Sequence, residues 1–387
     1  YDSLNFSYNK KDNKEIISSE INLNNLLFRI GKLNFTKNIN EDSKIEFESE
    51  IKDNEIIINN LYFINNNNNI TIDKLILNNN DYKIKNIKEV KIKLINDKQI
   101  NNELSLLGNK KEFIFIGESI DFSQFLDDIL KDTQNNNLSY LFDDLDANIK
   151  VQISKVFLDK KNFLENVYGK IKVNKNKTKS AEITSDNLNT GKFKLTQKII
   201  DDEMVTTIFA DNAEPFVKKF KFIKGFQDGT LDFYSTKKDD TSKSSIRIYS
   251  FKLKNIPILT KILSLASLQG IADLMTGEGI RFDDFEMNFS NKNNVMTIDE
   301  IYAIGPAISI LMSGYVEKNN LVSLRGTLVP ATTINKTIGS IPILGDILIG
   351  NKTGEGVFGV SFKIKGPPKD LKTTVNPIKT LTPRFIT

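Results

Sequence analysis

Two neighbouring stretches decide the fold: EIIINNLYFI, which is Glu55–Ile64, and ITIDKLIL, which is Ile70–Leu77. In both, apolar and polar side chains alternate at a period close to two, as in a strand with one apolar face. A run of asparagines, a common turn residue, joins the two stretches. Short strands punctuated in this way predict a meandering antiparallel sheet. A stacked β-solenoid gives similar spacing and stays open as a rival architecture.

The alternation slips by one residue within each stretch, at Asn59-Asn60 and at Asp73-Lys74. One extra residue turns the following side chains to the other face of a strand. A β-bulge or a tight turn at each slip therefore keeps the apolar set together. We take the apolar residues of the two stretches as candidates to line an apolar groove, first among them Ile56, Ile58, Ile70 and Ile72.

The strand pattern recurs along most of the chain. Further strands are expected at Ile16–Phe35, Lys83–Ile95, Lys111–Ile116, Ala147–Phe157, Asn166–Val173, Ser180–Leu188, Gly191–Ile199, Met204–Ala210, Gly229–Thr236, Ser244–Leu253, Ile280–Phe289, Val295–Ala303, Ile308–Val316, Leu321–Leu328 and Gly356–Lys365. A Pro-rich tail follows the last of them. Helical spacing of apolar residues predicts helices at Phe122–Leu130, Glu214–Phe226, Ile258–Leu268, Ile271–Met275 and Ile334–Ile349.

Strands far outnumber helices, so too few helices are available to cover the sheet. The predicted fold is mainly β: an elongated, curved antiparallel sheet that forms an apolar groove, with a few amphipathic helices concentrated toward the C-terminus. Three regions are expected: repeating strands over 1–116, a sheet with short helices over 117–253, and apolar helices capping the sheet over 254–387. These helices cap the sheet or contact a membrane through Leu259, Ile262, Leu263, Leu265, Ile343, Leu344 and Ile347.

Composition excludes much catalytic chemistry. The chain has no His and no Cys, so it lacks Ser-His and Cys-His catalytic systems and the usual ligands of zinc, haem and iron–sulfur centres. We expect no enzyme and no cofactor. The net charge is only +4, from 53 basic and 49 acidic residues, which argues against a nucleic-acid partner.

Neither a membrane span nor a leader is found in the sequence. No run of 18 apolar residues is present, so no transmembrane helix is expected. The chain begins at Tyr1 without a basic-then-apolar leader. We interpret it as a fragment whose targeting segment was removed or lies upstream.

Two local patterns resemble ligand-binding loops and fail at key positions. The calcium-like start at Asp144-x-Asp146 has Ile149 at its sixth position and Lys155 at its twelfth, where Gly and Glu are needed. We therefore expect turn residues and no metal site. The segment Gly345–Thr353 resembles a phosphate-binding loop but has Asn where Lys should follow the second Gly, and it follows a helix instead of a strand.

A lysine cluster lies among phenylalanines in the predicted helix at Glu214–Phe226. The simplest interpretation is a solvated helix edge, with Phe216, Phe220 and Phe226 facing inward. Ammonium groups also pair with phosphate as point charges, so a contact with lipid headgroups stays open. The candidates for that contact are Lys218, Lys219 and Lys221.

The last third of the chain resembles the C-terminal region of the AsmA-like family, in particular its YhdP-type members. The resemblance is carried by LKNIPILTKIL, 253–263, by the stretch from Gly270 to Phe282 that contains LMTGEGIRF, by AIGP, 303–306, by GYV, 314–316, and by RGTLVPA, 325–331. It continues through IN, 334–335, IPILGD, 341–346, GEGVFGV, 354–360, GP, 366–367, VNP, 375–377, and LTP, 381–383. Between about Gly117 and Ser250 the likeness is looser.

This resemblance implies a protein anchored in the inner membrane of a Gram-negative envelope, with its bulk in the periplasm. The family is similar to bridge-like lipid transfer proteins, in which a long curved sheet holds acyl chains. The implied role is non-enzymatic movement of phospholipid toward the outer membrane. None of the family's motif residues carries a catalytic role that could be transferred.

Three functions stay open at this point. The first is binding and transfer of phospholipid or another acyl-chain lipid. The second is a structural or assembly factor that binds outer-membrane proteins or another envelope partner. The third is a β-solenoid adhesin, against which the amphipathic C-terminal helices argue.

Overall fold

The computed structural model describes residues 3–11, 14–52, 54–109, 111–126, 141–142, 144–188, 191–218, 225–265, 268–318, 320–330, 359–368 and 370–378. The fold is mainly β, as predicted, with 70% strand and 8% helix. Of the 24 described strands, 22 belong to one open, mainly antiparallel sheet, and β3 and β4 form a small second one. The chain divides into two compact units, 1–201 and 202–387. The three regions expected from the sequence, 1–116, 117–253 and 254–387, have other bounds than these two units.

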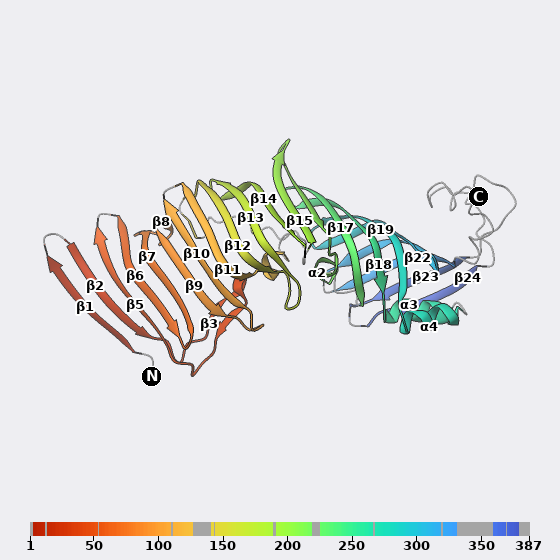
Figure 1. Cartoon of the computed structure of the whole chain (residues 1–387), viewed down its shortest axis with the longest axis horizontal. Helices are drawn as coiled ribbons and strands as arrows, with labels where there is room; N and C mark the ends of the chain where they lie inside the picture. Colours follow the sequence, from red (N-terminus) through yellow and green to blue (C-terminus); the bar gives the residue numbers. More distant parts are fainter. Residues whose placement is uncertain are drawn as a thin grey trace. The chain divides into compact units, whose positions relative to one another are not determined.

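Unit 1 is a strand meander (Figure 1, red to yellow-green). Its elements are β1 (Leu4–Lys11), β2 (Lys14–Asn22), β3 (Phe28–Ile30), η1 (Gly31–Leu33), β4 (Phe35–Lys37), β5 (Ser43–Lys52), β6 (Glu55–Asn65), β7 (Asn68–Asn78), β8 (Ile84–Ile87), β9 (Glu89–Ile95), β10 (Asn101–Asn109), β11 (Glu112–Asp121), β12 (Ala147–Phe157), β13 (Phe163–Asn174), β14 (Lys177–Asn187) and β15 (Gly191–Ile200). Of these, β1, β5 and β10 were not predicted. The expected strand at Ile16–Phe35 is interrupted, because residues 23–27 turn and η1 follows β3.

Unit 2 is a second meander, with the helices beside it (Figure 1, green to blue). Its elements are β16 (Glu203–Ala210), α2 (Glu214–Val217), β17 (Phe226–Lys238), β18 (Thr241–Leu253), α3 (Pro257–Leu265), α4 (Gln269–Thr276), β19 (Ile280–Lys292), β20 (Val295–Ile304), β21 (Ile308–Glu317), β22 (Leu321–Pro330), β23 (Gly359–Gly366) and β24 (Lys372–Ile378). The strand β24 lies in the expected Pro-rich tail. It pairs with β23 along its whole length, Pro377 included.

Sequence reasoning placed two helix ends wrongly. Leu268, the expected end of the helix at Ile258–Leu268, is not helical and lies just before α4. The helix expected at Glu214–Phe226 does not reach Phe226, because Phe226 is the first residue of β17. Gly225, just before it, has φ of +72°, a left-handed conformation that ends a helix or turns the chain. The predicted helix at Ile334–Ile349 and the phosphate-loop-like segment lie outside the described residues.

The phase slip at Asn59-Asn60 coincides with an irregularity of the sheet, whereas at Asp73-Lys74 the register between β6 and β7 continues without an extra residue. Opposite β5, the β6 strand carries one extra residue between the pairs Glu46–Tyr62 and Glu48–Asn59. Asn60 takes a left-handed φ of 51°, which Asn tolerates better than most residues. Phe63 pairs with Ile70 and Ile58 pairs with Leu75, so both halves of the two strands face the same way. This outcome confirms the bulge predicted at Asn59-Asn60.

Most strand pairs are antiparallel hairpins, which excludes a stacked solenoid for the described residues. The exception is β11 with β12, which run parallel. A parallel pair needs a long crossover, and residues 122–146 provide it. Of the helix expected at Phe122–Leu130, residues 122–126 are described, and 123–126 are helical. The strand before the crossover runs to Asp121, further than the predicted end at Ile116.

In unit 2, one helix pair touches strands that are far apart in the ladder. Helix α3 packs on α4 and on β24, while α4 packs on β19. In the antiparallel ladder β19 and β24 are separated by four other strands. The sheet of unit 2 must therefore curl so that the helix pair spans it.

Candidate functional site

The four groove candidates of the sequence lie on one face of unit 1. Ile56 and Ile58 pair with Leu77 and Leu75 on β7, and Ile70 and Ile72 pair with Ile92 and Val90 on β9. Directly paired residues share a face, so all of these side chains point to the same side, which we call the apolar face. The four candidates are neither buried nor fully exposed. They therefore line an open surface and not a closed core.

The apolar face continues across unit 1 as a row of paired residues. Ile72 pairs directly with Val90, and such direct pairs continue from each strand to the next as far as β14. Every member is part-exposed. At about 4.8 Å per strand, the seven strands span roughly 30 Å. We call this the central row: Ile72, Val90, Leu106, Phe115, Val151, Gly169 and Ile183.

Buried apolar side chains flank the central row on the same face. Toward one end of the strands lie Leu75 and Phe113, and toward the other lie Phe63, Leu104 and Val167. Each of these side chains is at most 9% exposed. The neighbours of the row along each strand point to the opposite face; most of them are polar, such as Lys91 and Gln152, and Leu107, Ile114 and Ile116 are exceptions. The central row is therefore a part-exposed apolar strip that lies between two rows of buried apolar side chains.

An insertion between β2 and β5 closes one end of this face. The rings of Phe28 and Phe35 pack on Phe63, with centroids 5.5 Å and 6.3 Å away. Lys37 holds the insertion together from inside: its side chain is fully buried and its Nζ donates to the backbone carbonyls of Asn24 and Leu26, both at 2.8 Å. Sequence reasoning missed this lysine, because nothing in its neighbours signals burial.

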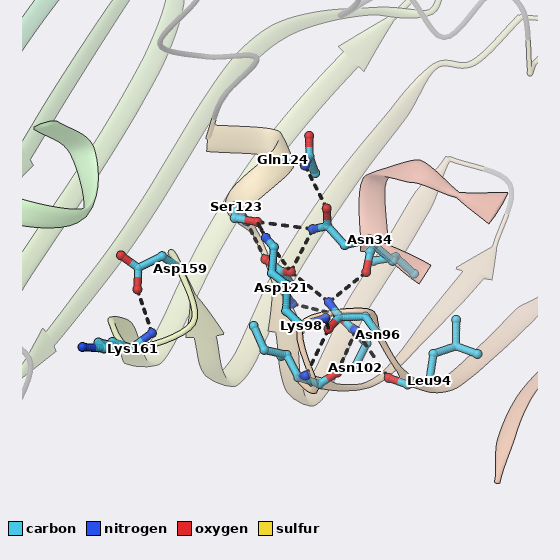
Figure 2. Close-up of polar contacts among 12 residues, drawn as sticks. Asn34, Leu94, Asn96, Lys98, Asn102, Asp121, Ser123, Gln124, Asp159 and Lys161 are labelled. Carbon is cyan, nitrogen blue, oxygen red and sulfur yellow. Dashed lines mark hydrogen bonds and ion pairs between the residues drawn. The ribbon is translucent and has the colours of Figure 1, made fainter. Parts of the chain in front are cut away.

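A buried polar cluster ties the same end to the neighbouring strands (Figure 2). The Asp121 carboxylate is fully buried. Its Oδ2 accepts from Asn34 Nδ2 and from Asn96 Nδ2, both at 2.8 Å, and lies 3.2 Å from Lys98 Nζ. Its Oδ1 accepts from the backbone N–H of Ser123 at 3.0 Å. The cluster joins η1, the β9–β10 turn, the end of β11 and the helix that starts at Ser123.

The Asp121 cluster predicts acid sensitivity of unit 1. Burial raises the pKa of Asp121, but hydrogen bonds from Ser123 and the charge of Lys98 outweigh it, so the pKa is lowered on balance. A lowered pKa in the folded state stabilises the fold above the ordinary Asp value of about 3.9, and this stabilisation is lost as the pH falls through the lower folded value. We expect the urea midpoint of unit 1 to drop below about pH 4.

The Asp121→Asn variant tests this at neutral pH. It keeps the shape of the side chain but loses the charge, so we expect a cost of about 2 kcal/mol and a flatter dependence of the urea midpoint on pH. Circular dichroism at a series of pH values measures both. An unchanged midpoint at pH 7 would contradict the stabilising role of the carboxylate.

A cavity of about 620 Å³ opens beside this cluster. It is lined by side chains of both signs, including Lys98, Lys155, Glu118 and Glu165. Lys155 Nζ lies 4.3 Å from the centroid of the Phe163 ring. Because polar groups line this cavity, it suits water or a polar group better than an acyl chain.

The interior of unit 2 is filled, in contrast to the open strip of unit 1. Phe282 is fully buried, and Met287 and Phe289 are each 2% exposed. Phe226, Phe251 and Phe282 stack in sequence across three strands, with ring centroids 5.1 Å and 5.2 Å apart. This face of unit 2 is a packed core.

The apolar helix residues of unit 2 largely belong to that core. Leu259, Ile262 and Leu263 are 7%, 2% and 0% exposed, whereas Leu265, at the end of α3, is 51% exposed. Their burial favours the cap over membrane contact for the first three. The other helix candidates, Ile343, Leu344 and Ile347, lie outside the described residues.

The headgroup candidates of the sequence receive little support. Lys218 forms an ion pair with Glu214, one helical turn earlier. Lys219 and Lys221 lie outside the described residues. On the outer face of unit 2, Glu286 accepts from Tyr302 Oη at 2.7 Å and from Arg247 Nε at 2.9 Å. Burial and the hydrogen bond to Glu286 raise the pKa of Tyr302 to about 12, so it stays protonated at neutral pH.

No metal-ligand cluster of three or more His, Cys, Asp or Glu is found in the described part of the chain. Asp146, from the calcium-like pattern, accepts from Asn174 Nδ2 at 2.7 Å and from the Lys175 backbone N–H at 2.8 Å, as a turn residue does. Nor does any described helix have the length and apolarity to cross a bilayer.

Comparison with protein-family models, with curated proteins and with solved structures finds no match. The apolar face is therefore interpreted from its own chemistry.

Proposed function

We propose that this chain binds the acyl chains of lipids along the apolar face of unit 1, as part of a non-enzymatic lipid-transfer protein. The observation that carries the proposal is the central row, seven part-exposed apolar positions in register across seven strands. Contiguous apolar surface of this kind favours association or a bound ligand. A ligand that covers the row removes the surface from water.

The dimensions support an acyl chain as that ligand. The row is roughly 30 Å long, about twice the span of one leaflet of a bilayer's hydrocarbon core. Each buried CH₂ contributes about 0.8 kcal/mol, so two acyl chains bind without specific polar contacts. The row contains no charged side chain, and its members have similar chemistry. A chain can therefore slide along it between sites of similar energy, which is what transfer requires.

The compartment belongs to the proposal as well. The resemblance of the last third of the chain to the AsmA-like family supports a periplasmic location, with an inner-membrane anchor in the full-length protein. The cargo is then phospholipid, moving between the inner and outer membranes of a Gram-negative envelope.

The direct test is the lipid content of the purified chain. We expect native mass spectrometry and organic extraction to detect phospholipid bound after expression in a Gram-negative host. A delipidated chain should take up fluorescent phospholipid from vesicles. A chain that purifies without lipid and takes none up refutes the proposal.

One observation favours a second candidate, an envelope assembly factor that binds a protein strand. The strand β1 is an edge of the described sheet, and Leu4, Phe6 and Tyr8 on its apolar side are 60%, 68% and 53% exposed. An edge strand with exposed apolar side chains can pair with another strand. Titration of the lipid-free chain with an unfolded outer-membrane protein tests this candidate. Binding that Phe6→Lys abolishes would favour it.

A further inference from the structure

The outer face of unit 1, opposite the apolar face, is unevenly charged. From Ala147 to Ile200, the span of β12–β15, twelve residues are lysine and four are Asp or Glu, although the whole chain carries only +4. Six of these lysines alternate along β12, β13 and β15 with residues of the apolar face, and all six are exposed. We call them the basic face: Lys150, Lys170, Lys172, Lys192, Lys194 and Lys198.

Few carboxylates offset this charge. Glu182 and Asp186 share the face: Lys194 Nζ lies 3.2 Å from Glu182, and Lys192 stands directly opposite Asp186 in the register. Within the described residues, no carboxylate lies at ion-pair distance from the remaining four lysines, which are Lys150, Lys170, Lys172 and Lys198. Their ammonium groups face solvent and are free to meet an external anion.

The register also places two like charges side by side. Lys150 on β12 pairs directly with Lys170 on β13. Like charges directly opposite each other destabilise an antiparallel pair. Glu182 lies directly opposite Lys170 on β14 and offsets part of this repulsion. An anionic partner that approaches the outer face would relieve the rest.

Exposed apolar side chains lie among the lysines. Tyr168 is 54% exposed and lies on the same face as Lys170, two residues along β13. On β11, which neighbours β12, Ile114 and Ile116 are 42% and 36% exposed, with Ile114 opposite Lys150. Lysine, tyrosine and aliphatic side chains together suit the interfacial layer of a bilayer, where ammonium groups meet phosphates and apolar groups enter the acyl boundary. Aliphatic side chains offer no stacking surface to nucleic-acid bases.

We propose that the basic face binds the surface of a membrane containing anionic phospholipid and holds the outer side of unit 1 against it. This goes beyond acyl-chain binding, because it concerns the opposite face of the sheet and does not depend on it. The attraction is electrostatic, so it falls with salt and requires anionic lipid.

The test is cosedimentation of the whole chain with vesicles of phosphatidylcholine, with and without phosphatidylglycerol. We expect binding only with phosphatidylglycerol, and weaker binding as salt rises. The Lys170→Glu/Lys172→Glu variant should bind at least about tenfold more weakly.

The matched control is Lys91→Glu/Lys93→Glu, on the outer face of β9. It makes the same change in net charge at the same spacing. Each variant also places one new Glu opposite an existing one, Glu182 for β13 and Glu103 for β9. In the native chain Lys91 and Lys93 lie 3.1 Å from Glu89 and 3.9 Å from Glu103. We expect this control to bind vesicles as the native chain does.

A single substitution separates binding from folding. Lys150→Glu turns the repulsive pair with Lys170 into an attractive one, so the urea midpoint should stay the same or rise while vesicle binding falls. Loss of binding cannot then come from unfolding. The content of extracted lipid should stay unchanged in all basic-face variants, which distinguishes failure of this inference from failure of acyl-chain binding.

Four outcomes would overturn the inference. Equal loss in the β9 control would assign binding to net charge, and native-like binding of the β13 variant would exclude the basic face. Binding to a single-stranded oligonucleotide but not to vesicles would indicate a nucleic-acid surface. Salt-sensitive self-association without vesicle binding would indicate a second copy, whose partner face would be the acidic one at Glu46, Glu48 and Glu50.

Discussion

The Val151→Glu/Ile183→Glu variant is expected to lose its bound lipid almost completely. Val151 on β12 and Ile183 on β14 are both part-exposed members of the central row, separated by Gly169 on β13. A carboxylate in contact with an acyl chain must give up water without gaining a partner, which costs several kcal/mol. Since about 1.4 kcal/mol corresponds to tenfold in affinity, we expect a loss of well over tenfold.

The chain offers a closely matched control. Gln152 and Thr184 are the next residues along the same two strands and point to the outer face. The Gln152→Glu/Thr184→Glu variant has the same number of new charges in the same strands but leaves the central row apolar. It should retain its lipid. Quantification of phospholipid per chain by extraction and mass spectrometry compares the two, and equal lipid content in both would refute the role of the apolar face.

Because the residues of the central row are part-exposed, the two variants can be compared as folded proteins. A charge forced into a closed core would unfold the protein, but side chains at a part-exposed position keep access to water when no ligand is bound. We therefore expect both variants to fold, with circular dichroism like that of the native chain.

Truncation of Phe282 to Ala should have the largest effect on stability. The Phe282 side chain is fully buried in unit 2 and stacks on Phe251 at 5.2 Å between centroids. Removing the ring loses its burial, leaves a cavity and breaks the stack that runs on to Phe226. Phe→Ala changes in cores cost about 3–5 kcal/mol, a large share of the stability of an ordinary domain.

The control for this change is Phe209→Ala on β16, where the ring is 37% exposed. It removes the same atoms from a more solvent-exposed site, so we expect less than half the loss of folding stability. Because the chain has no Trp and two compact units, hydrogen exchange read by mass spectrometry is the suitable measurement. Phe282→Ala should accelerate exchange in β17–β20 and leave exchange in β9–β13 unchanged. Equal acceleration in both units would contradict the division of the chain into two units that unfold separately.

Patterning was sufficient for much of the fold. Period-two alternation placed β6, β7 and β12 to within two residues, and the phase slip at Asn59-Asn60 predicted a bulge that the register shows. It also brought Ile56, Ile58, Ile70 and Ile72 to one face, because side-chain direction in a strand depends only on position along it. The strands β1 and β5 were missed, although Leu4, Phe6 and Tyr8 in β1 and Ile45, Phe47 and Ile51 in β5 lie on one face of a period-two pattern.

What patterning could not supply is the depth at which each side chain lies. Leu265 shares the apolar spacing of α3 with Leu263, yet one is half-exposed and the other fully buried. Burial depends on what packs over a residue from elsewhere in the chain. The same reason hid Lys37 and Asp121, whose partners come from carbonyls and side chains of other elements.

By itself, the sequence determined a mainly β chain with an apolar and a polar side to each strand, since local alternation suffices for that. Only the tertiary structure decided that unit 1 leaves a central row open while unit 2 fills its interior with Phe282, Met287 and Phe289. It also gathered the lysines of β12–β15 into one basic face, because strand register brings distant residues side by side. Register and packing depend on the whole chain, and no single stretch of sequence contains them.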